Sequence, residues 1–371
     1  MKVLFCTPTA STSGIAKCAS YLMDYFIANP YAGFDIELFP MDSIKYLGEN
    51  ASLYKRIPLG IRAYTKVILR LKQTLKISRP DIVHINSSAS LGLIRDYIIL
   101  WLCKKNGIRT CMHFHFGRIP EICRQNNWEW RLMKRVVKKS DKIIVMNDTC
   151  YDSLSTLGLK NICNIPNPLS PKVIEIANQA NSALNWNNVI FVGHVLPTKG
   201  IYELFEAVSH FNKINLYIIG QDPLGILPKL EKIYPELFSQ GRVHVTGHIP
   251  QKEAIAMMKK GLFVFPSHTE GFPNVILESM VCGSPIIASS VGSIPEMLDI
   301  NSNFQCGICV PPKNSQSLIN AIEWVYNNRG AALEMGALAK KRVFDKYNIN
   351  IVAKRLVDTW YSAVSNTTNN Q

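Results

Sequence analysis

Short runs of apolar residues alternate along this chain with longer segments in which apolar residues recur every three or four positions. The first run covers residues 2–6 and leads, through a loop of small residues, into a helical pattern over 15–26. A short run without polar positions is typical of a strand buried on both faces, and the longer spacing is typical of an amphipathic helix. The pattern predicts an α/β protein built on parallel sheets.

The same alternation continues to the end of the chain. Further strands are predicted to begin near residues 81, 110, 141, 189, 215, 242, 263 and 286. Helices are predicted at 148–157, from 201 onward, and at 275–283, 316–328, 331–344 and 349–364. Repeated strand and helix units of this kind form doubly wound, Rossmann-like sheets.

The length of the chain predicts two domains. At 371 residues it exceeds the usual size of a single core, since domains hold about 100–200 residues. An Asn- and Ser-rich segment, 169–187, is predicted to link an N-terminal domain, 1–168, to a C-terminal domain, 188–348. The last helix, within 349–371, is expected to pack back on the first domain. The two domains are expected to face a central cleft.

The composition excludes several classes of protein. With 47% apolar and 18% charged residues, the chain is globular and neither disordered nor fibrous. The first apolar run ends at Pro8, too early for a secretory signal, and the richest run, Tyr97–Cys103, is too short to cross a bilayer. The ten cysteines are scattered through apolar runs, which predicts free thiols in a reducing cytoplasm. The pair Cys306 and Cys309 lacks the second pair that a zinc site needs.

Positive charge is concentrated in the first half of the chain. Residues 1–180 hold 25 of the 41 Lys and Arg residues and 13 of the 27 Asp and Glu residues, so they carry +12 of the formal charge of +14. A basic domain indicates an acidic partner: nucleic acid, an anionic membrane surface or a phosphorylated substrate.

Part of this charge lies on a predicted amphipathic helix. Between Lys45 and Arg79, basic residues are interleaved with apolar ones, and Ile61, Tyr64, Ile68, Leu71 and Leu75 fit one helical face. Such a helix is a candidate for binding at a membrane surface. The alternative is a solvated helix whose apolar face packs on its own core.

The stretch from Phe263 to Ser289 carries the clearest chemistry. It predicts a strand, a loop with Glu270, a helix with Glu278 that ends at Gly283, and a second strand. The backbone N–H groups of 271–274 lie where a helix N-terminus directs unpaired donors at an anion. A carboxylate at a helix start can also accept hydrogen bonds from a sugar diol. The stretch therefore predicts a site for a phosphorylated, hydroxyl-rich ligand.

These residues resemble a known family. Two glutamates separated by seven residues, Gly-Phe-Pro-Asn after the first and Cys-Gly-Ser-Pro at the helix exit are similar to the E-x7-E signature of retaining, nucleotide-sugar-dependent glycosyltransferases with the GT-B fold (family 4, group 1). The resemblance implies that Glu270 is catalytic and contacts the donor sugar, and that Glu278 holds the ribose. The residues between them that it assigns to the donor are Gly271, Phe272, Pro273 and Asn274.

The resemblance assigns further donor contacts in the second half. The family usually has Gly-Arg-x4-Lys-Gly after the strand near 189; here Gly193 and Lys199 match, and His194 replaces the arginine. Histidine lacks the fixed fork of donors of arginine, so Lys199 is expected to compensate more of the diphosphate charge. Gly247 and His248 match the base-binding loop.

Two positions in the first half also match the family. His115 fits the histidine that the family carries at a strand end near the donor sugar, and strand alternation places His113 on the same face. Gly14 matches a glycine that faces the donor diphosphate or the acceptor, although the paired glycine is Ser13 here. An ordinary turn at the start of a helix is the alternative for Gly14. The G-x-G-x-x-G fingerprint is absent, which disfavours a dehydrogenase.

The resemblance implies transfer of a hexosyl residue from a nucleotide-sugar with retention of configuration. No Asp-x-Asp pair follows a strand, so we expect no metal and no cofactor, with Lys199, His194 and helix dipoles stabilising the leaving diphosphate. Together with the basic first domain, the resemblance implies a lipid-diphosphate-linked or other glycan acceptor in surface polysaccharide biosynthesis. The enzyme is then cytoplasmic, at the inner face of the cell membrane.

Three alternatives remain at this point. A nucleic-acid-binding protein explains the charge but not the two glutamates, and no nucleic-acid motif is present. A GT-B-shaped sugar-nucleotide isomerase or an inactive scaffold shares the fold without the transfer reaction. The charge can also serve solubility, or a soluble phosphorylated acceptor, in place of a membrane.

Overall fold

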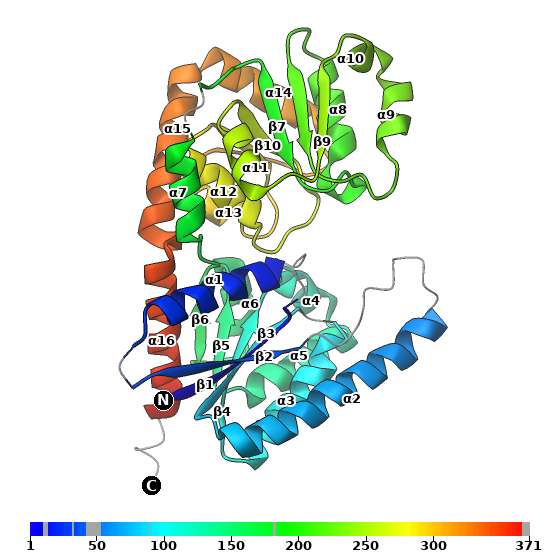
Figure 1. The fold of residues 1–371 in the computed structure, drawn as a ribbon. Helices are drawn as coiled ribbons and strands as arrows, with labels where there is room; N and C mark the ends of the chain where they lie inside the picture. The colour runs from blue at the N-terminus through cyan, green and yellow to red at the C-terminus, as the bar shows by residue number, and fades with distance from the viewer. Residues whose placement is uncertain (10–13, 32, 42–52, 89, 181–182, 366–371) are drawn as a thin grey trace. The chain divides into compact units, whose positions relative to one another are not determined.

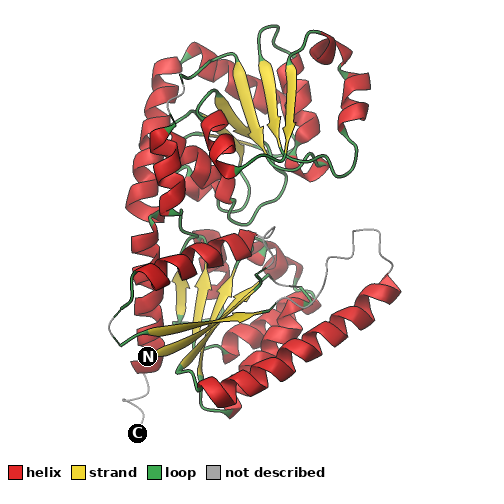
Figure 2. Ribbon diagram, in the orientation of Figure 1, coloured by secondary structure: helices red, strands yellow, loops and turns green. Residues whose placement is uncertain are grey.

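The computed structural model describes residues 1–371 except 10–13, 32, 42–52, 89, 181–182 and 366–371, and in 53–61 it describes the backbone alone. The chain divides into two compact units, Met1–Pro168 with Ile349–Gln371, and Leu169–Asn348. Each unit is built on one six-stranded sheet with helices on both faces (Figures 1 and 2). The predicted α/β class with two doubly wound sheets is confirmed.

The first unit contains a parallel sheet of strand order β2-β1-β3-β4-β5-β6. Its strands are β1 (Lys2–Thr7), β2 (Asp35–Pro40), β3 (Ile82–Ser87), β4 (Arg109–Phe114), β5 (Lys142–Val145) and β6 (Ile162–Asn164). Its helices are α1 (Gly14–Ala28), α2 (Leu53–Ser78), α3 (Gly92–Lys105), α4 (Ile119–Gln125), α5 (Trp128–Lys139), α6 (Asp148–Ser155) and α16 (Ile349–Ser365). Strand order reverses direction between β1 and β3, which is where open α/β sheets bind ligands beyond the carboxyl ends of their strands.

Both faces of this sheet are buried, which explains why its strands read as continuous apolar runs. Along β1, Val3 and Phe5 pack in one core layer with residues of α1 and α16. Leu4 and Cys6 point to the other layer, against α2, α3 and α5. Successive residues of a strand face opposite sides, so every position of β1 between Val3 and Cys6 must be apolar.

The last helix, α16, completes the first unit. It contacts β3, β4, β5 and α1, and its Trp360 is fully buried. The indole ring stacks on Phe34 at a centroid distance of 5.7 Å, and its Nε1 donates a hydrogen bond to Nδ1 of the buried His84 at 3.1 Å. A segment some 180 residues distant in sequence from the first domain therefore supplies part of its core.

The second unit repeats the architecture, with strand order β12-β11-β10-β7-β8-β9. Its strands are β7 (Asn188–Val192), β8 (Asn215–Ile219), β9 (Val243–Gly247), β10 (Leu262–Phe265), β11 (Ile286–Ser289) and β12 (Ile308–Val310). Its helices are α7 (Pro171–Gln179), η1 (Pro197–Lys199), α8 (Ile201–Ser209), α9 (Leu227–Ile233), α10 (Pro235–Ser239), α11 (Gln251–Met258), α12 (Asn274–Cys282), α13 (Ile294–Met297), α14 (Ser315–Asn327), α15 (Arg329–Arg342) and η2 (Val343–Tyr347). Here the strand order reverses between β7 and β10.

The segment 169–187 is more than the linker that its Asn and Ser content predicts. Helix α7 lies within it, with Pro171 in its first turn, and Val173 and Ala177 are fully buried four residues apart. The helix packs on α11 and α12, and Nζ of Lys259 donates to the carbonyl oxygen of Ala177 at 2.8 Å. The linker prediction is wrong for this part because two buried apolar positions outweigh the polar composition.

Helix α2 packs on its own unit. Leu71 and Leu75 are buried as predicted, and the buried stripe continues among the described side chains with Val67 and Ala63, four and eight residues before Leu71. Tyr64 and Ile68 lie beside the stripe and are half-buried. The side chain of Ile61 and residues 45–52 of the predicted basic segment lie outside the described residues.

Two further expectations concern thiols and membrane spans. All ten cysteines are free. Within the described part of the chain, no helix combines the length and the apolar composition needed to cross a bilayer.

The buried His84 predicts acid-sensitive stability. Burial lowers its pKa to about 3, whereas in the unfolded chain it titrates near 6.5. Below about pH 6.5 the unfolded state therefore binds a proton that the folded state does not, and the stability present above that pH is lost as pH falls toward 3. Urea unfolding from pH 7 to 4 is expected to show this fall. His84→Gln should reduce the pH slope, and the exposed His210→Gln should leave it unchanged. Equal slopes in all three proteins would contradict the assignment.

Candidate active site

The loops at the carboxyl ends of β7 and β10 bring together two charged residues of the second unit, Lys199 and Glu270. Nζ of Lys199 lies 2.5 Å from Oε1 of Glu270, and Oγ of Ser267 donates to the same oxygen at 2.7 Å. The Lys199 and Glu270 side chains are 27% and 12% exposed, so the pair is only partly open to solvent. The ammonium has three N–H donors and the pair occupies one. The arrangement fixes a positive charge at the point where the strand order reverses.

Backbone packing fixes the position of Lys199. Gly200 follows it with a φ of +72°, and a Cβ atom there would lie 2.0 Å from the carbonyl oxygen of Pro266. Only glycine fits so close an approach. The backbone N–H of His268 donates to the carbonyl oxygen of Thr198 at 2.8 Å, joining the same two loops. The need for glycine directly after Lys199 is therefore steric.

A side-chain hydrogen bond joins the same loop to α8. Nε2 of His268 donates to Oε1 of Glu203 at 2.9 Å, and both side chains are less than one-fifth exposed. Sequence reasoning missed Ser267, His268 and Glu203, because no local signal shows which distant loop they contact.

The loop after β11 holds the segment that follows Glu270. Gly292 has a φ of +56°, and a Cβ atom there would lie 2.3 Å from the carbonyl oxygen of Glu270. The backbone N–H and Oγ of Ser293 donate to the carbonyl oxygen of Gly271 at 3.0 and 2.8 Å. Three loops therefore determine the position of Glu270 and Gly271.

The N-terminus of α12 follows directly. Phe272 and Pro273 are buried, and the Phe272 ring meets Tyr347 edge to face at 5.8 Å. The helix starts at Asn274, and its N-cap residue, Pro273, forms no side-chain capping hydrogen bond. The positive end of the α12 dipole thus lies four residues after Glu270, the partner of Lys199.

Glu278 lies one turn along α12 from Asn274 and is 7% exposed. Its Oε1 accepts a hydrogen bond from Nε2 of Gln251, the first residue of α11, at 2.7 Å. A buried carboxylate held by an amide is well suited to accept hydroxyl hydrogen bonds, because its orientation is already fixed. Gln251 carried no sequence signal.

Glycines occupy the carboxyl ends of β7, β8 and β9. A Cβ atom at Gly220 would lie 2.0 Å from the carbonyl oxygen of Gly193, and Gly220 forms a β-bridge with Gly247. Gly193 and Gly247 have positive φ angles of +154° and +68°. The adjoining His194 and His248 are both exposed. The structure brings the predicted glycines to one edge of the sheet.

The first unit holds a cluster of histidines at the ends of β3 and β4. The rings of His113 and His115 have centroids 3.9 Å apart, and His84 meets His113 edge to face at 5.4 Å. Oδ1 of Asn86 accepts from Nε2 of both His115, at 2.7 Å, and His84, at 3.1 Å. His84 also accepts the Trp360 hydrogen bond at Nδ1, so the network assigns its proton to Nε2.

The histidines in this cluster are neutral at physiological pH. Burial lowers the pKa of His115 to about 4 and the pKa of His113 well below its usual value. Because Nε2–H of His115 donates a hydrogen bond to Asn86, the buried Nδ1 atom carries a lone pair. A neutral imidazole in this state can accept a hydrogen bond from a sugar hydroxyl.

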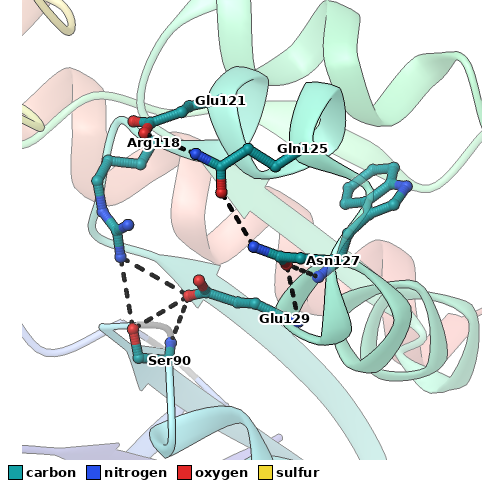
Figure 3. Close-up of polar contacts among 7 residues, drawn as sticks. Ser90, Arg118, Glu121, Gln125, Asn127 and Glu129 are labelled. Atoms are coloured by element: carbon teal, nitrogen blue, oxygen red, sulfur yellow. Dashed lines mark hydrogen bonds and ion pairs between the residues drawn. The ribbon is translucent and has the colours of Figure 1, made fainter.

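A polar network holds Ser90, which lies between β3 and α3, in place (Figure 3). Oε1 of Glu129 accepts from the backbone N–H and Oγ of Ser90 at 2.8 and 3.1 Å, and Nη2 of Arg118 lies 3.7 Å from the same oxygen. Ser90 has a φ of +53°, a conformation that these bonds stabilise. Asn127 caps α5 by accepting from the N–H groups of Glu129 and Trp130. This network was not predicted from the sequence.

The predicted site residues thus fall in two places. Gly14, an exposed residue at the start of α1, and His115 belong to the first unit. All the others belong to the second unit. Ser13, beside Gly14, lies outside the described residues. Across the described residues, no three or more His, Cys, Asp or Glu side chains are grouped as a metal site.

Two family models match consecutive parts of the chain. Residues 31–173 match the family described as Glycosyltransferase Family 4, and residues 173–342 match Glycosyl transferases group 1. Together these matches cover most of both units.

The names of two curated relatives include a lipid. The gpi3 subunit of the phosphatidylinositol N-acetylglucosaminyltransferase of Schizosaccharomyces pombe is 25% identical over 59% of this chain and 48% of its own length. The N,N'-diacetylbacillosaminyl-diphospho-undecaprenol alpha-1,3-N-acetylgalactosaminyltransferase of Campylobacter jejuni is 25% identical over 63% of this chain and 64% of its own length. The match thus spans about half to two thirds of these relatives.

Solved structures show the same fold over nearly the whole chain. Sucrose-phosphate synthase from Thermosynechococcus elongatus superposes with a TM-score of 0.78 at 18% identity, covering 98% of this chain and 99% of that one. The lipopolysaccharide outer core galactosyltransferase WaaB gives 0.73 at 18% identity, and the Anabaena protein HepE in complex with UDP gives 0.71 at 17%; both comparisons cover 98% of this chain. These similarities establish the GT-B fold. The chain belongs to the group 1, family 4 glycosyltransferases.

Proposed function

We propose that this glycosyltransferase moves a hexosyl residue from a nucleotide-sugar to a glycan acceptor with retention of configuration. The observation that carries the proposal is the Lys199–Glu270 pair at the carboxyl edge of the second sheet. Glu270 is followed by the N-terminus of α12, and the buried Glu278 lies one helical turn into that helix. Positive charge, helix dipole and two carboxylates in one place suit a ligand that joins a diphosphate to two sugars.

Each part of the donor then has a chemical counterpart. The Lys199 ammonium and the N-terminus of α12 stabilise the negative charge of the leaving nucleoside diphosphate. Glu270 accepts hydrogen bonds from the transferred sugar, and Glu278 accepts them from the ribose. His194 is exposed and adds positive charge only when protonated, so Lys199 carries most of the compensation. Gly247 and His248, at the carboxyl end of β9, contact the base of the nucleotide.

His115 is proposed to act on the transferred sugar as a neutral hydrogen-bonding group. Asn86 orients the ring by accepting a hydrogen bond from its Nε2–H, and burial keeps the ring uncharged. A neutral imidazole positions a hydroxyl without adding a charge that would oppose the developing oxocarbenium ion.

We further propose a lipid-diphosphate-linked acceptor and action at the cytoplasmic face of a membrane in surface polysaccharide biosynthesis. Two facts support this assignment: the first half of the chain carries +12 of the net charge, and the names of two relatives include a lipid, which in one of them is a diphospho-undecaprenol. Basic residues near a membrane surface are each attracted by about 1 kcal/mol.

The reaction is tested by screening nucleotide-sugars, beginning with UDP-glucose, for thermal stabilisation, since a ligand that binds the folded state raises its melting temperature by mass action. The stabilising donor is then incubated with candidate acceptors and the product analysed. Donor-dependent transfer supports the proposal. Interconversion of the sugar-nucleotide without transfer would indicate an isomerase, and binding without turnover would indicate a scaffold.

Glu278→Ala and Lys199→Ala are each expected to lower donor affinity about ten- to hundredfold, because a lost charged hydrogen bond costs about 1.5–3 kcal/mol. Two consecutive exposed residues of α9 provide matched controls: Glu231→Ala and Lys232→Ala are expected to leave donor affinity unchanged. Calorimetric titration of the donor measures both sets. Wild-type affinity in both site variants would refute the donor site.

Turnover is expected to continue in the presence of a chelator. The motivation is the positive charge of Lys199 at the proposed diphosphate position, together with the missing Asp-x-Asp sequence. Initial rates are measured with EDTA, with magnesium and with manganese. Loss of activity in EDTA that either metal restores would be the opposing result.

A further inference from the structure

A cavity of about 970 Å³ lies in the first unit, at the edge of the sheet opposite to the histidine cluster. Its walls come from residues that immediately precede β3, β4 and β5 and from the last turns of α2, α3, α5 and α16. Figure 1 shows α2 and α3 side by side in this unit. The cavity is therefore at the amino edge of the strands, whereas His115 follows the carboxyl end of β4. None of the predicted site residues lines it.

The charged side chains around the cavity are mostly positive. Five cations line it: Lys76, Arg79, Lys104, Arg109 and Lys139.

Two carboxylates line the cavity as well, and both are engaged by protein donors. Asp141 accepts from Nη1 of Arg109 at 2.9 Å and from the N–H and Oγ1 of Thr110 at 2.8 Å. Asp81 accepts from the backbone N–H of Lys2 at 2.6 Å. The lining groups therefore sum to a charge of +3.

Helix dipoles do not cancel this charge. Four helices end at the cavity, and each C-terminus contributes roughly −0.5, or about −2 in all. The five cations and two carboxylates exceed that by about one positive charge. Lys105 and Lys138, in the last turns of α3 and α5, add to the excess. An anion of one or more charges is thus the chemically matched occupant.

The surroundings of the cavity indicate where that anion comes from. Ile77, next to Lys76 on α2, is 85% exposed, and Trp101, next to the lining residue Leu100 on α3, is 48% exposed. Nζ of Lys105 lies 5.5 Å from the Trp101 ring centroid. Exposed apolar and aromatic side chains among lysines are typical of surfaces that meet lipid headgroups, where the cations contact phosphate and the rings lie at the interface.

We propose that this cavity binds the phosphate of an anionic membrane lipid. The inference deepens the membrane part of the proposed function and rests on it, but it is independent of the donor site. In this proposal the first domain binds lipid phosphate at one place, the cavity, and not through positive charge spread over its surface. The acceptor-side contact of the first unit would then be held at a lipid surface through α2 and α3.

The test compares two double variants of the full chain. Lys76→Gln/Lys104→Gln removes two cations that line the cavity. Lys66→Gln/Arg131→Gln removes two exposed cations on α2 and α5 that do not line it. Binding is measured by sedimentation with phosphatidylcholine vesicles, with and without phosphatidic acid, at low and raised salt. The cavity pair is expected to bind the anionic vesicles about tenfold or more weakly than wild type, and the control pair within about twofold of it.

Three outcomes overturn the proposal. Equal losses in the two pairs would show general surface attraction. Negligible wild-type binding to anionic vesicles at low salt would remove the lipid. Binding of inorganic pyrophosphate that depends on Lys76 and Lys104, without any vesicle preference, would reassign the cavity to a soluble phosphate. Donor affinity depends on the second unit and is expected to stay unchanged in both pairs, so a failed donor site and a failed lipid site are distinguishable.

Discussion

Two backbone contacts between loops, each too close for a Cβ atom, fix the site of the second unit. Gly200 packs against the carbonyl oxygen of Pro266, and Gly292 packs against that of Glu270. Because these loops are in contact, Lys199 reaches Glu270, and Ser267 and Ser293 reach the same segment. A side chain at either glycine would separate the loops and with them the charges. Preorganised charge of this kind needs no rearrangement when a diphosphate leaves.

A different interaction organises the first unit. Trp360 of the last helix donates to His84, and Asn86 joins His84 to His115. The helix that closes the core thus also supports the orientation of a proposed substrate contact through hydrogen bonds. Burial keeps these imidazoles neutral, which links the stability of the core to the protonation state on which the role of His115 depends.

The sequence allowed the fold and the family to be predicted, because both depend on local signals. Strands buried on two faces are continuous apolar runs, and the glutamate signature lies within one strand, loop and helix. The contacts of Glu278 with Gln251, of His268 with Glu203 and of Ser90 with Glu129 were not predictable, since they join residues 27 to 65 positions apart and no local pattern links the two partners. Helix α7 was mistaken for a linker because polar composition concealed two buried positions, and the cations of the amino-edge cavity are dispersed along the chain from Lys76 to Lys139.

The central claim is that Glu270 contacts the transferred sugar while Lys199 contacts the diphosphate. Calorimetric titration of Glu270→Gln with the nucleotide-sugar and with the corresponding nucleoside diphosphate tests it directly. The account predicts weaker binding of the nucleotide-sugar alone; binding of the nucleoside diphosphate should be unchanged or tighter, since Lys199 loses its carboxylate partner. Equal weakening of both ligands would contradict the account, because it would place Glu270 at the nucleotide and not at the sugar.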